Sequence, residues 1–172
     1  MKGLSRRSIL LGGTAAATLA ALPVGLQFAG AALAAGTGPV PGTFEVTHTE
    51  EEWLQILGKD AYEVMRNQGT EYPWSSPLLD EHREGTFICA GCDLPLFDSA
   101  TKYDSGTGWP SFWQPLDNAV GEMTDTLLGY ARTEVHCRRC GGHLGHVFPD
   151  GPKPTGLRYC MDGVALKFVP KA

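Results

Sequence analysis

The spacing of hydrophobic and polar residues changes twice along this chain. From Ile9 to Ala34 the residues are largely alanine, leucine and glycine, and no acidic residue occurs up to that point. Between Trp53 and Met65 apolar residues recur at helical spacing, and beyond Gly69 short β-prone runs replace this period. The pattern predicts an N-terminal leader, a helical segment and a mostly β domain.

The helical segment has a defined start and an interruption. Thr49 and Glu52 stand three residues apart, which is the spacing of a capping box that begins a helix. Gly58 interrupts the apolar stripe that follows, and Gly69 ends it, so we expect two short helices. Their apolar residues are Trp53, Leu54, Ile56 and Leu57 in the first, and Ala61, Tyr62, Val64 and Met65 in the second.

The β-prone runs are separated by glycine, aspartate and proline, as expected for short strands joined by turns. The expected strands are Thr86–Cys89, Pro95–Phe97, Leu127–His136, Leu144–Phe148, Arg158–Met161 and Val164–Val169. We expect a mainly β fold in which an N-terminal helical layer lies beside an antiparallel β core.

The first residues are typical of an export signal. Residues 1–34 combine a basic start with an apolar run that ends in small residues, a pattern that favours a cleaved signal peptide over a membrane anchor. Arg6 and Arg7 resemble the twin-arginine signal, which exports folded proteins across the bacterial cytoplasmic membrane. Residues 35–43 are predicted to be a flexible linker, and residues 44–172 the folded domain. The expected location is therefore periplasmic or otherwise outside that membrane.

Charge excludes one class of partner. The whole chain has 14 basic and 19 acidic residues, and removal of the leader with its three basic residues leaves 11 basic ones and changes the net charge from −5 to −8. A nucleic acid is therefore not an expected partner. We expect a monomer.

Four of the five cysteines form two C-x-x-C pairs, Cys89 with Cys92 and Cys137 with Cys140. Two such pairs suit a closed tetrahedral site, and sulfur-rich ligation favours structural Zn²⁺. The long separation of the pairs indicates that the metal would join two hairpins of a larger domain. Disulfides, a thioredoxin-type redox pair and unrelated packing are the alternatives.

The fifth cysteine, Cys160, stands alone. A lone cysteine is often a small buried hydrophobe, but Arg158 would lie on the same side of a strand, where its charge favours the thiolate. Upstream, His143 and His146 lie close together in a glycine-rich segment. A thiol with nearby imidazoles is typical of a nucleophile with proton donors, although surface, core or metal-binding histidines are the alternatives.

An aromatic segment adds an apolar surface to these groups. Trp109, Phe112 and Trp113 fall within five residues of one another, and core packing or the cover of a turn is the plain interpretation. Such an apolar wall would also suit a thioether or a methyl group.

Together these segments resemble the peptide-methionine (R)-S-oxide reductase family, commonly called MsrB. The resemblance spans about residues 49–170. The motifs that carry it are Gly69-Thr-Glu71, Cys89-Ala-Gly-Cys92, Leu96-Phe-Asp-Ser99, Gly108-Trp-Pro-Ser-Phe112, His136-Cys137, Gly142-His-Leu-Gly-His-Val-Phe-Pro-Asp-Gly151 and Thr155-Gly-Leu-Arg-Tyr-Cys160. It implies two antiparallel sheets with short N-terminal helices, a structural zinc, and reduction of the R epimer of methionine sulfoxide, free or in oxidised proteins.

The resemblance also implies a role for each site residue. Cys160 matches the catalytic cysteine, and His143 and His146 match the histidines that bind and protonate the sulfoxide oxygen. Arg158 matches the residue that tunes the thiolate. Trp109 matches the wall of the methyl pocket, which Phe112 and Phe148 are expected to complete. Such a site is expected to favour the thiolate and the imidazolium at the same time.

Two positions depart from the family pattern. Thr107 stands where many members have a recycling cysteine, so the Cys160 sulfenic acid is expected to be reduced by an external thiol such as a thioredoxin-like protein. Asp162 stands where asparagine is usual, and near Cys160 its charge would oppose thiolate formation and could hold an imidazolium. The alternatives are a non-catalytic, zinc-stapled binding module of related fold and a disulfide-handling oxidoreductase.

Overall fold

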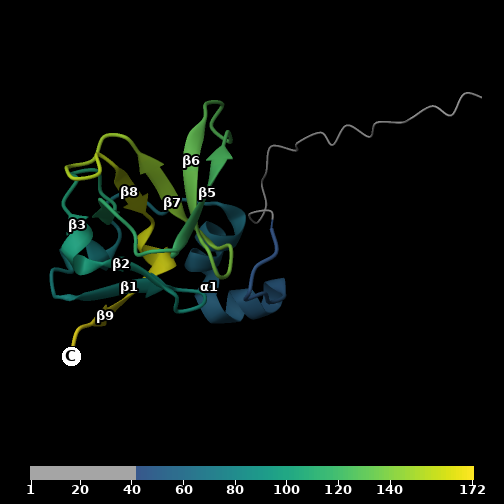
Figure 1. Ribbon diagram of the computed structural model, residues 1–172. Helices are drawn as coiled ribbons and strands as arrows, with labels where there is room; N and C mark the ends of the chain where they lie inside the picture. The colour runs from purple at the N-terminus through teal and green to yellow at the C-terminus, as the bar shows by residue number, and fades with distance from the viewer. Residues whose placement is uncertain (1–41) are drawn as a thin grey trace, which may run out of the picture. The chain divides into compact units, whose positions relative to one another are not determined.

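The computed structural model describes residues 42–172 (Figure 1). The predicted signal peptide and most of the predicted linker lie outside the described residues. Within residues 42–172, no helix is both long enough and apolar enough to cross a membrane.

The predicted helical segment is α1, Glu50–Asn67. The capping box is confirmed: the Glu52 amide donates to Thr49 Oγ1 at 3.2 Å, and the Thr49 amide donates to Glu52 Oε2 at 2.9 Å. The predicted interruption is also confirmed, because Gly58 has φ 70° and kinks the helix. This left-handed conformation is open to glycine but disfavoured for other residues, so the two expected helices are two arms of one kinked element.

The strands form two antiparallel sheets, as Figure 1 shows, and the expected fold class is confirmed. The order in the three-stranded sheet is β2 (Pro95–Asp98), β1 (Gly85–Cys89) and β9 (Leu166–Pro170). The order in the six-stranded sheet is β3 (Lys102–Tyr103), β4 (Ser111–Phe112), β8 (Arg158–Met161), β7 (His143–Phe148), β6 (Arg132–Cys137) and β5 (Val120–Asp125). The 3-10 helix η1 (Pro77–Asp80) lies between α1 and β1, whereas η2 (Ser99–Thr101) and η3 (Gly163–Ala165) lie between strands.

A stack of aromatic side chains joins the two sheets. Phe87 on β1 and Phe97 on β2 both pack on Phe112 of β4, at ring-centroid distances of 5.0 and 4.3 Å. All three side chains are fully buried, and each contributes about 2 to 3 kcal/mol of hydrophobic stabilisation. Trp53 and Met65 of α1 belong to the same core. This core holds the six-stranded sheet, which carries the site described below.

Two of the expected strands differ in extent from the structure. The run expected at Leu127–His136 starts only at Arg132, because Leu127 opens an exposed turn in which its amide donates to Asp125 Oδ1 at 2.8 Å. The strand β5, which precedes this turn, was not predicted, since its sequence includes glycine and three polar residues. The run expected at Val164–Val169 begins as η3 and becomes β9 at Leu166.

Candidate active site and cysteine cluster

The four paired cysteines come together at the ends of two hairpins. The β1–β2 hairpin turns at Cys89, whose amide donates to the Leu94 carbonyl at 2.8 Å, and the β6–β7 hairpin turns at Cys137, whose amide donates to the Gly142 carbonyl at 2.9 Å. Since β1 and β6 belong to different sheets, the cluster links the two sheets. The four sulfur atoms lie within 4.8 Å of one another.

The sulfur spacing fits a tetrahedral metal ion. The Sγ atoms of Cys89 and Cys140 are 3.7 Å apart, and those of Cys92 and Cys137 are 3.5 Å apart. A metal bound to four thiolates at about 2.3 Å requires sulfur–sulfur distances of about 3.8 Å, whereas a disulfide requires about 2.05 Å. All five cysteines are free thiols, so the structure contains no disulfide among residues 42–172.

Hydrogen bonding within the cluster distributes its protons unevenly. Hydrogen bonds with Cys137 and the other cysteines raise the pKa of Cys89 above its ordinary value and lower that of Cys92 below it. The cause is that four adjacent sulfur atoms cannot all be anionic without a cation among them. The donor set therefore suits a metal ion that holds all four thiolates.

A row of register partners crosses the six-stranded sheet and contains the lone cysteine. Cys160 on β8 pairs with His146 on β7 and with Ser111 on β4, and Ser111 pairs in turn with Tyr103 on β3. On the far side, His146 pairs with Glu134 on β6. Register partners in adjacent strands point to the same face of a sheet. The sheet thus brings the predicted nucleophile beside one of the predicted histidines.

A β-bulge brings the second histidine to the same place. His143 and His146 are three residues apart, and in a regular strand they would point to opposite faces. The register between β6 and β7 shifts after Val135, and the imidazole centroids lie 5.3 Å apart. Gly145 has φ 144°, and a Cβ there would lie 2.1 Å from the Cys160 carbonyl oxygen. Glycine is therefore required where β7 passes closest to the cysteine strand.

Each histidine is held by an acidic residue that sequence reasoning missed. His143 Nδ1 lies 2.7 Å from Glu134 Oε1, and both side chains are at most 2% exposed. His146 Nε2 lies 2.8 Å from Asp125 Oδ2, an oxygen that also accepts from Arg132 at 2.5 Å. The one available signal was an acid beside a β-prone residue, Glu134 next to Val135. Asp125 belongs to β5, which was not predicted.

The two carboxylates orient the imidazoles. Acceptance by Glu134 makes His143 Nδ1 the donating nitrogen and leaves Nε2 without a hydrogen-bond partner among the described residues. Burial by itself raises the pKa of Asp125, but the Leu127 amide, His146 and Arg132 together hold it below its ordinary value. Asp125 is therefore an anion that keeps His146 in place. The buried Nε2 of His143 is free to meet a ligand oxygen.

Burial acts against the expected protonation states. It raises the pKa of Cys160, and it lowers the pKa of His146 despite the nearby Asp125 carboxylate. Both shifts oppose the thiolate and the imidazolium that the resemblance implies, because both groups are removed from water. In the folded protein without substrate, desolvation thus favours the thiol and the neutral imidazole.

Arg158 lies near Cys160, as expected from their spacing on β8. Its guanidinium forms two 2.9 Å hydrogen bonds with the Asp150 carboxylate and stacks 4.4 Å above the Phe148 ring. The positive charge of Arg158 lowers the pKa of Cys160, but desolvation has the larger, opposite effect. Arg158 therefore moderates the thiol pKa without making the thiolate the resting form.

A chain of hydroxyl groups leads away from the Cys160 sulfur. Thr107 Oγ1 lies 3.9 Å from Cys160 Sγ and 2.8 Å from Ser105 Oγ, which is 2.7 Å from Ser111 Oγ. Ser111 Oγ donates to the Trp109 carbonyl at 3.1 Å. Because a carbonyl only accepts, the chain is satisfied when each hydroxyl donates toward Trp109 and the Cys160 thiol donates to Thr107. Thr107 thus contacts the predicted nucleophile.

The aromatic residues expected to line a methyl pocket separate into two groups. Trp109 is partly exposed, and its indole donates to the Glu71 carbonyl at 3.2 Å. Phe148 is partly exposed at a ring-centroid distance of 6.4 Å from His146. Phe112 does not belong to the site, and its predicted role is wrong. It follows Ser111 on β4, so it points to the opposite face and is fully buried against Phe97.

Asp162 is buried between His143 and the loop that carries Glu71. One carboxylate oxygen accepts from the Glu71 amide at 2.9 Å, and the other lies 3.9 Å from His143 Nε2. Burial raises the pKa of Asp162 to about 7. The negative charge of Asp162 in turn raises the pKa of Cys160. The charge of Asp162 therefore opposes thiolate formation at Cys160, which is the direction expected from the sequence.

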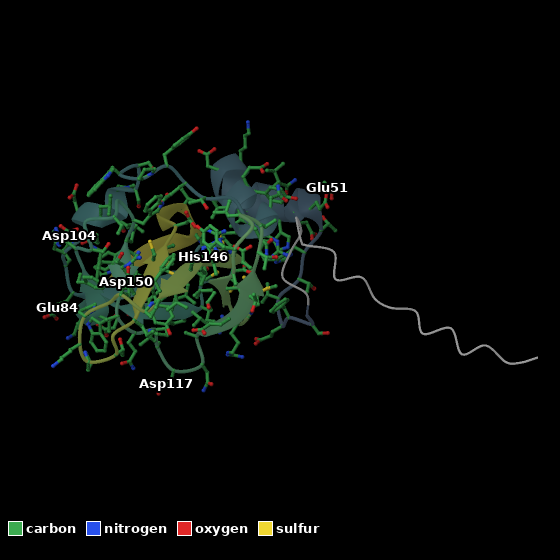
Figure 2. All side chains as sticks on the ribbon, turned by 90° about the horizontal axis from the view of Figure 1, so that it is seen from above. Glu51, Glu84, Asp104, Asp117, His146 and Asp150 are labelled. Carbon is green, nitrogen blue, oxygen red and sulfur yellow. The ribbon has the colours of Figure 1, made fainter. Side chains whose placement is uncertain are left out.

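Figure 2 shows His146 within the interior of the domain, whereas Glu51 and Asp117 lie at its periphery. The thiol of Cys160 carries a proton, and the nitrogen that a neutral imidazole turns away from its carboxylate partner can accept one.

Comparison with known proteins identifies the family. Residues 57–170 match the family model described as the SelR domain. A protein from Pseudomonas putida (strain W619) named peptide methionine sulfoxide reductase MsrB is 54% identical over 128 residues, which cover 74% of this chain and 96% of that protein. A protein of the same name from Leifsonia xyli subsp. xyli (strain CTCB07) is 51% identical over 132 residues, covering 76% of this chain and 95% of that protein.

The chain belongs to the MsrB family. Membership confirms the resemblance drawn from the sequence motifs. It also gives the two departures their positions in an MsrB fold: Thr107 contacts the lone cysteine, and Asp162 lies behind His143.

Proposed function

We propose that this MsrB-family protein reduces the R epimer of methionine sulfoxide, free or in oxidised proteins, to methionine, with Cys160 as the nucleophile. The observation that carries the proposal is the placement of Cys160 beside His146 in one cross-strand row, with His143 brought in by the bulge. Each imidazole has a buried carboxylate partner. Such an arrangement transfers a proton at a defined place.

The first chemical step balances without any external proton. The Cys160 sulfur bonds to the sulfoxide sulfur while its proton passes to the sulfoxide oxygen. The resulting hydroxyl group then moves to the Cys160 sulfur, so that the S–O bond of the substrate and the transient S–S bond both break, methionine leaves, and Cys160 becomes a sulfenic acid. His143 and His146 donate to the oxygen and relay the proton, and their carboxylate partners stabilise the imidazolium that forms in transit.

Two groups would stabilise the Cys160 sulfur during this step, and other residues would hold the substrate or exchange a proton. The Arg158 charge supports the sulfur as it becomes anionic, and the Thr107 hydroxyl can turn to donate to it. Trp109 and Phe148 would contact the methyl and methylene groups of the substrate. Phe112, which the sequence had added to this pocket, would not. Asp162 would accept a proton from His143 or donate its own, because its raised pKa lets both forms exist near neutrality.

Recycling would require an external thiol. The chain has five cysteines, four of which form the cluster, and Thr107 cannot form a disulfide. A thioredoxin-like thiol would condense with the sulfenic acid to form a mixed disulfide and water, and a second thiol would release Cys160. Mass spectrometry after one turnover without reductant should show one added oxygen on Cys160. An intramolecular disulfide at Cys160 would contradict this route.

We assign Zn²⁺ to the cysteine cluster. Four thiolates at tetrahedral spacing favour zinc over hard cations, and a site with four protein ligands has no open position for substrate. When bound, zinc supplies a redox-inert crosslink between the two sheets. Cys89, Cys92, Cys137 and Cys140 would hold it.

Export by the twin-arginine route remains part of the proposal. It is supported by Arg6 and Arg7 before an apolar run, and by a metal cluster that is best filled during cytoplasmic folding. The proposed role outside the cytoplasmic membrane is repair of oxidised exported proteins, with the protein acting as a monomer.

The deciding experiment is an assay with resolved R and S methionine sulfoxides and a dithiol reductant. We expect reduction of the R epimer alone, and no reduction of either epimer by the Cys160→Ser variant. Activity retained in that variant would overturn the assignment of Cys160 as the nucleophile. Lack of activity in the wild-type protein with its zinc content intact would favour a non-catalytic zinc-stapled module, which has no need of Cys160 and the two histidines.

A further inference from the structure

Three hydroxyl groups, those of Thr107, Ser105 and Ser111, connect the Cys160 sulfur to the Trp109 carbonyl, and we name them the hydroxyl chain. Ser105 Oγ is central, since it lies 2.8 Å from Thr107 Oγ1 and 2.7 Å from Ser111 Oγ. The chain begins at the Cys160 sulfur, 3.9 Å from Thr107 Oγ1, and ends at the Trp109 carbonyl oxygen, 3.1 Å from Ser111 Oγ. It therefore joins the proposed nucleophile to the backbone of a residue that is expected to contact substrate.

A tight turn brings two of these hydroxyl groups together. Gly106, between Ser105 and Thr107, has φ 68°, in the left-handed region that favours glycine. The Gly106 amide donates to Asp104 Oδ1 at 2.8 Å, and the Thr107 amide donates to Ser105 Oγ at 3.4 Å. The loop before β4 thus holds the hydroxyl groups of Ser105 and Thr107 in contact.

The central hydroxyl group can donate in one direction only. A serine hydroxyl has one proton and two lone pairs. Because Ser105 Oγ already accepts from the Thr107 amide, one lone pair and one proton remain for its two hydroxyl neighbours. Ser105 must donate to one of them and accept from the other. All three hydroxyl groups therefore point the same way along the chain.

The two directions suit two states of the sulfur. When the chain points toward Trp109, Ser111 donates to the carbonyl and Thr107 donates to Ser105, so the Thr107 oxygen can accept from the Cys160 thiol. When the chain is reversed, Thr107 donates to the sulfur and the Trp109 carbonyl loses the Ser111 proton. A thiol has a proton to donate, whereas a thiolate only accepts. The first direction therefore stabilises the thiol, and the second stabilises the anionic sulfur.

Burial gives the two directions different free energies. Ser111 is fully buried on β4, in register with Cys160 on β8, so water cannot replace a partner that its hydroxyl group loses. Reversal removes the Ser111 hydrogen bond from the Trp109 carbonyl. The loss of that hydrogen bond opposes deprotonation of Cys160 by about the strength of one neutral hydrogen bond.

We propose that the hydroxyl chain is a reversible switch, which points toward Trp109 while Cys160 keeps its proton and reverses to donate to the sulfur as the proton leaves. Thr107 is then a catalytic residue in contact with the reacting sulfur, and Ser105 and Ser111 are positioning residues that act through it. Reversal rotates three O–H bonds and moves no proton between residues, since the thiol proton passes to the sulfoxide oxygen. The catalytic role rests on the proposed function, but the state of the sulfur can be measured without turnover.

Charged and titratable groups around Cys160 come from its own strand, from β7, from β3 and from the residues after β8. They are Arg158, His143, His146, Tyr103 and Asp162. The Arg158 charge lowers the pKa of Cys160, whereas burial and the Asp162 charge raise it. Substitutions within the hydroxyl chain leave all five of these groups in place, so a change in the pKa of Cys160 reports the chain.

The test is the pH dependence of Cys160 alkylation in zinc-loaded protein, followed by mass spectrometry at that residue. In Ser111→Ala the chain loses the group that fixes its direction, so Thr107 can turn to the sulfur and the midpoint should fall by about 0.5 to 1 pH unit, the size of one hydrogen bond. In Thr107→Val the sulfur loses its hydroxyl donor, so the midpoint should rise by a similar amount. Entry of water would lower the midpoint in both variants, because burial raises the pKa of Cys160.

A double variant tests whether Ser111 acts through Thr107. Thr107→Val combined with Ser111→Ala should have the midpoint of Thr107→Val alone, because the remaining hydroxyl group of Ser105 does not contact the sulfur. Independent effects would add, and their opposite signs would place the double variant near the wild type. Thr101→Val is the matched control, since the Thr101 hydroxyl group donates to the Asp98 carbonyl at 2.8 Å, outside the hydroxyl chain. Its midpoint should equal that of the wild type.

Turnover tests the catalytic role of Thr107. The single-turnover rate with methionine-R-sulfoxide should fall about tenfold in Thr107→Val, because the sulfur becomes anionic without this donor. An unchanged rate would refute the catalytic role.

The remaining outcomes separate the switch from the proposed function. Ser105→Ala should lower the midpoint as Ser111→Ala does, and its partly exposed position lets it carry the test if Ser111→Ala does not fold. Unchanged midpoints, shifts of the same sign in Thr107→Val and the serine variants, or an additive double variant would overturn the switch and leave the function standing. The expected shifts in a protein that reduces no methionine sulfoxide would refute the proposed function and confirm that the hydroxyl chain sets the state of the sulfur.

Discussion

Replacing Asp162 with asparagine removes one titratable group at nearly constant side-chain size. Asp162 is 3% exposed, and its burial raises its pKa from 3.8 to about 7. The Glu71 amide and the nearby His143 oppose this rise, and the Glu71 carboxylate adds to it, but desolvation dominates. Because asparagine carries no charge at any pH, the variant lacks the loss of folding stability that the wild type undergoes as the pH rises.

The size and sign of the effect follow from proton linkage. Below about pH 4 Asp162 is protonated in both the folded and the unfolded protein. Between about pH 4 and 7 the unfolded chain releases the proton and the folded one keeps it, so each pH unit destabilises the wild type by about 1.4 kcal/mol. A difference of about 3 pH units corresponds to about 4 kcal/mol, reached near pH 7 and retained above it.

The assay is urea unfolding of zinc-loaded wild type and Asp162→Asn at several pH values from 4.5 to 8. We expect the free energy of unfolding of the variant, relative to the wild type, to rise by about 3 to 4 kcal/mol across this range. Asp117→Asn is the control, since Asp117 is exposed, and its difference from wild type should not change with pH. A pH-independent difference for Asp162→Asn would refute the reasoning.

The same variant should change the chemistry of the thiol. Asp162 raises the pKa of Cys160, so its removal should move the pH dependence of Cys160 alkylation, followed by mass spectrometry at that residue, to lower pH. The pH–rate profile of sulfoxide reduction should move the same way. Unchanged profiles would mean that the Asp162 charge does not act on the nucleophile.

Three further predictions test the other parts of the site. Thr107→Cys should form an intramolecular disulfide with Cys160 after one turnover, because Thr107 Oγ1 is already 3.9 Å from that sulfur; a sulfenic acid that persists in this variant would contradict the placement. Glu134→Gln should lower kcat about tenfold or more with little change in KM, because His143 loses its carboxylate partner, and a change in KM alone would assign Glu134 to binding. Removal of metal by a strong chelator should lower Tm by on the order of 10 °C or more, and an unchanged Tm would show that no metal joins the sheets.

Much of the fold can be predicted from local sequence patterns. The capping box, the kink at Gly58 and the hairpin turns at the cysteine pairs are all formed by residues close together in the chain, so short-range chemistry determines them. The strand β5 was missed because its register with β6 depends on the partner strand, and Val120–Asp125 lacks a run of β-formers. Strand stability is more context-dependent than helix stability.

The candidate site divides in the same way. Cys160, its histidines and the four clustered cysteines are identifiable from residue type and spacing, because few other arrangements need those groups together. Glu134 and Asp125 could not be assigned as partners of the histidines, since 9 and 21 positions separate each acid from its imidazole. Phe112 was misassigned because it points from β4 into the core, on the face opposite Ser111. A strand of two residues is too short for the sequence to show which of its side chains is buried.

By itself, then, the sequence determined the family, the chemical groups available and the local turns that present them. Tertiary structure decided which face each group occupies and how it is protonated. The bulge in β7 between His143 and Gly145 brings the two imidazoles together, and burial raises the pKa of Cys160 and lowers that of His146. Both effects depend on strands distant in the chain, because register and desolvation arise only when the sheet has formed and excluded water.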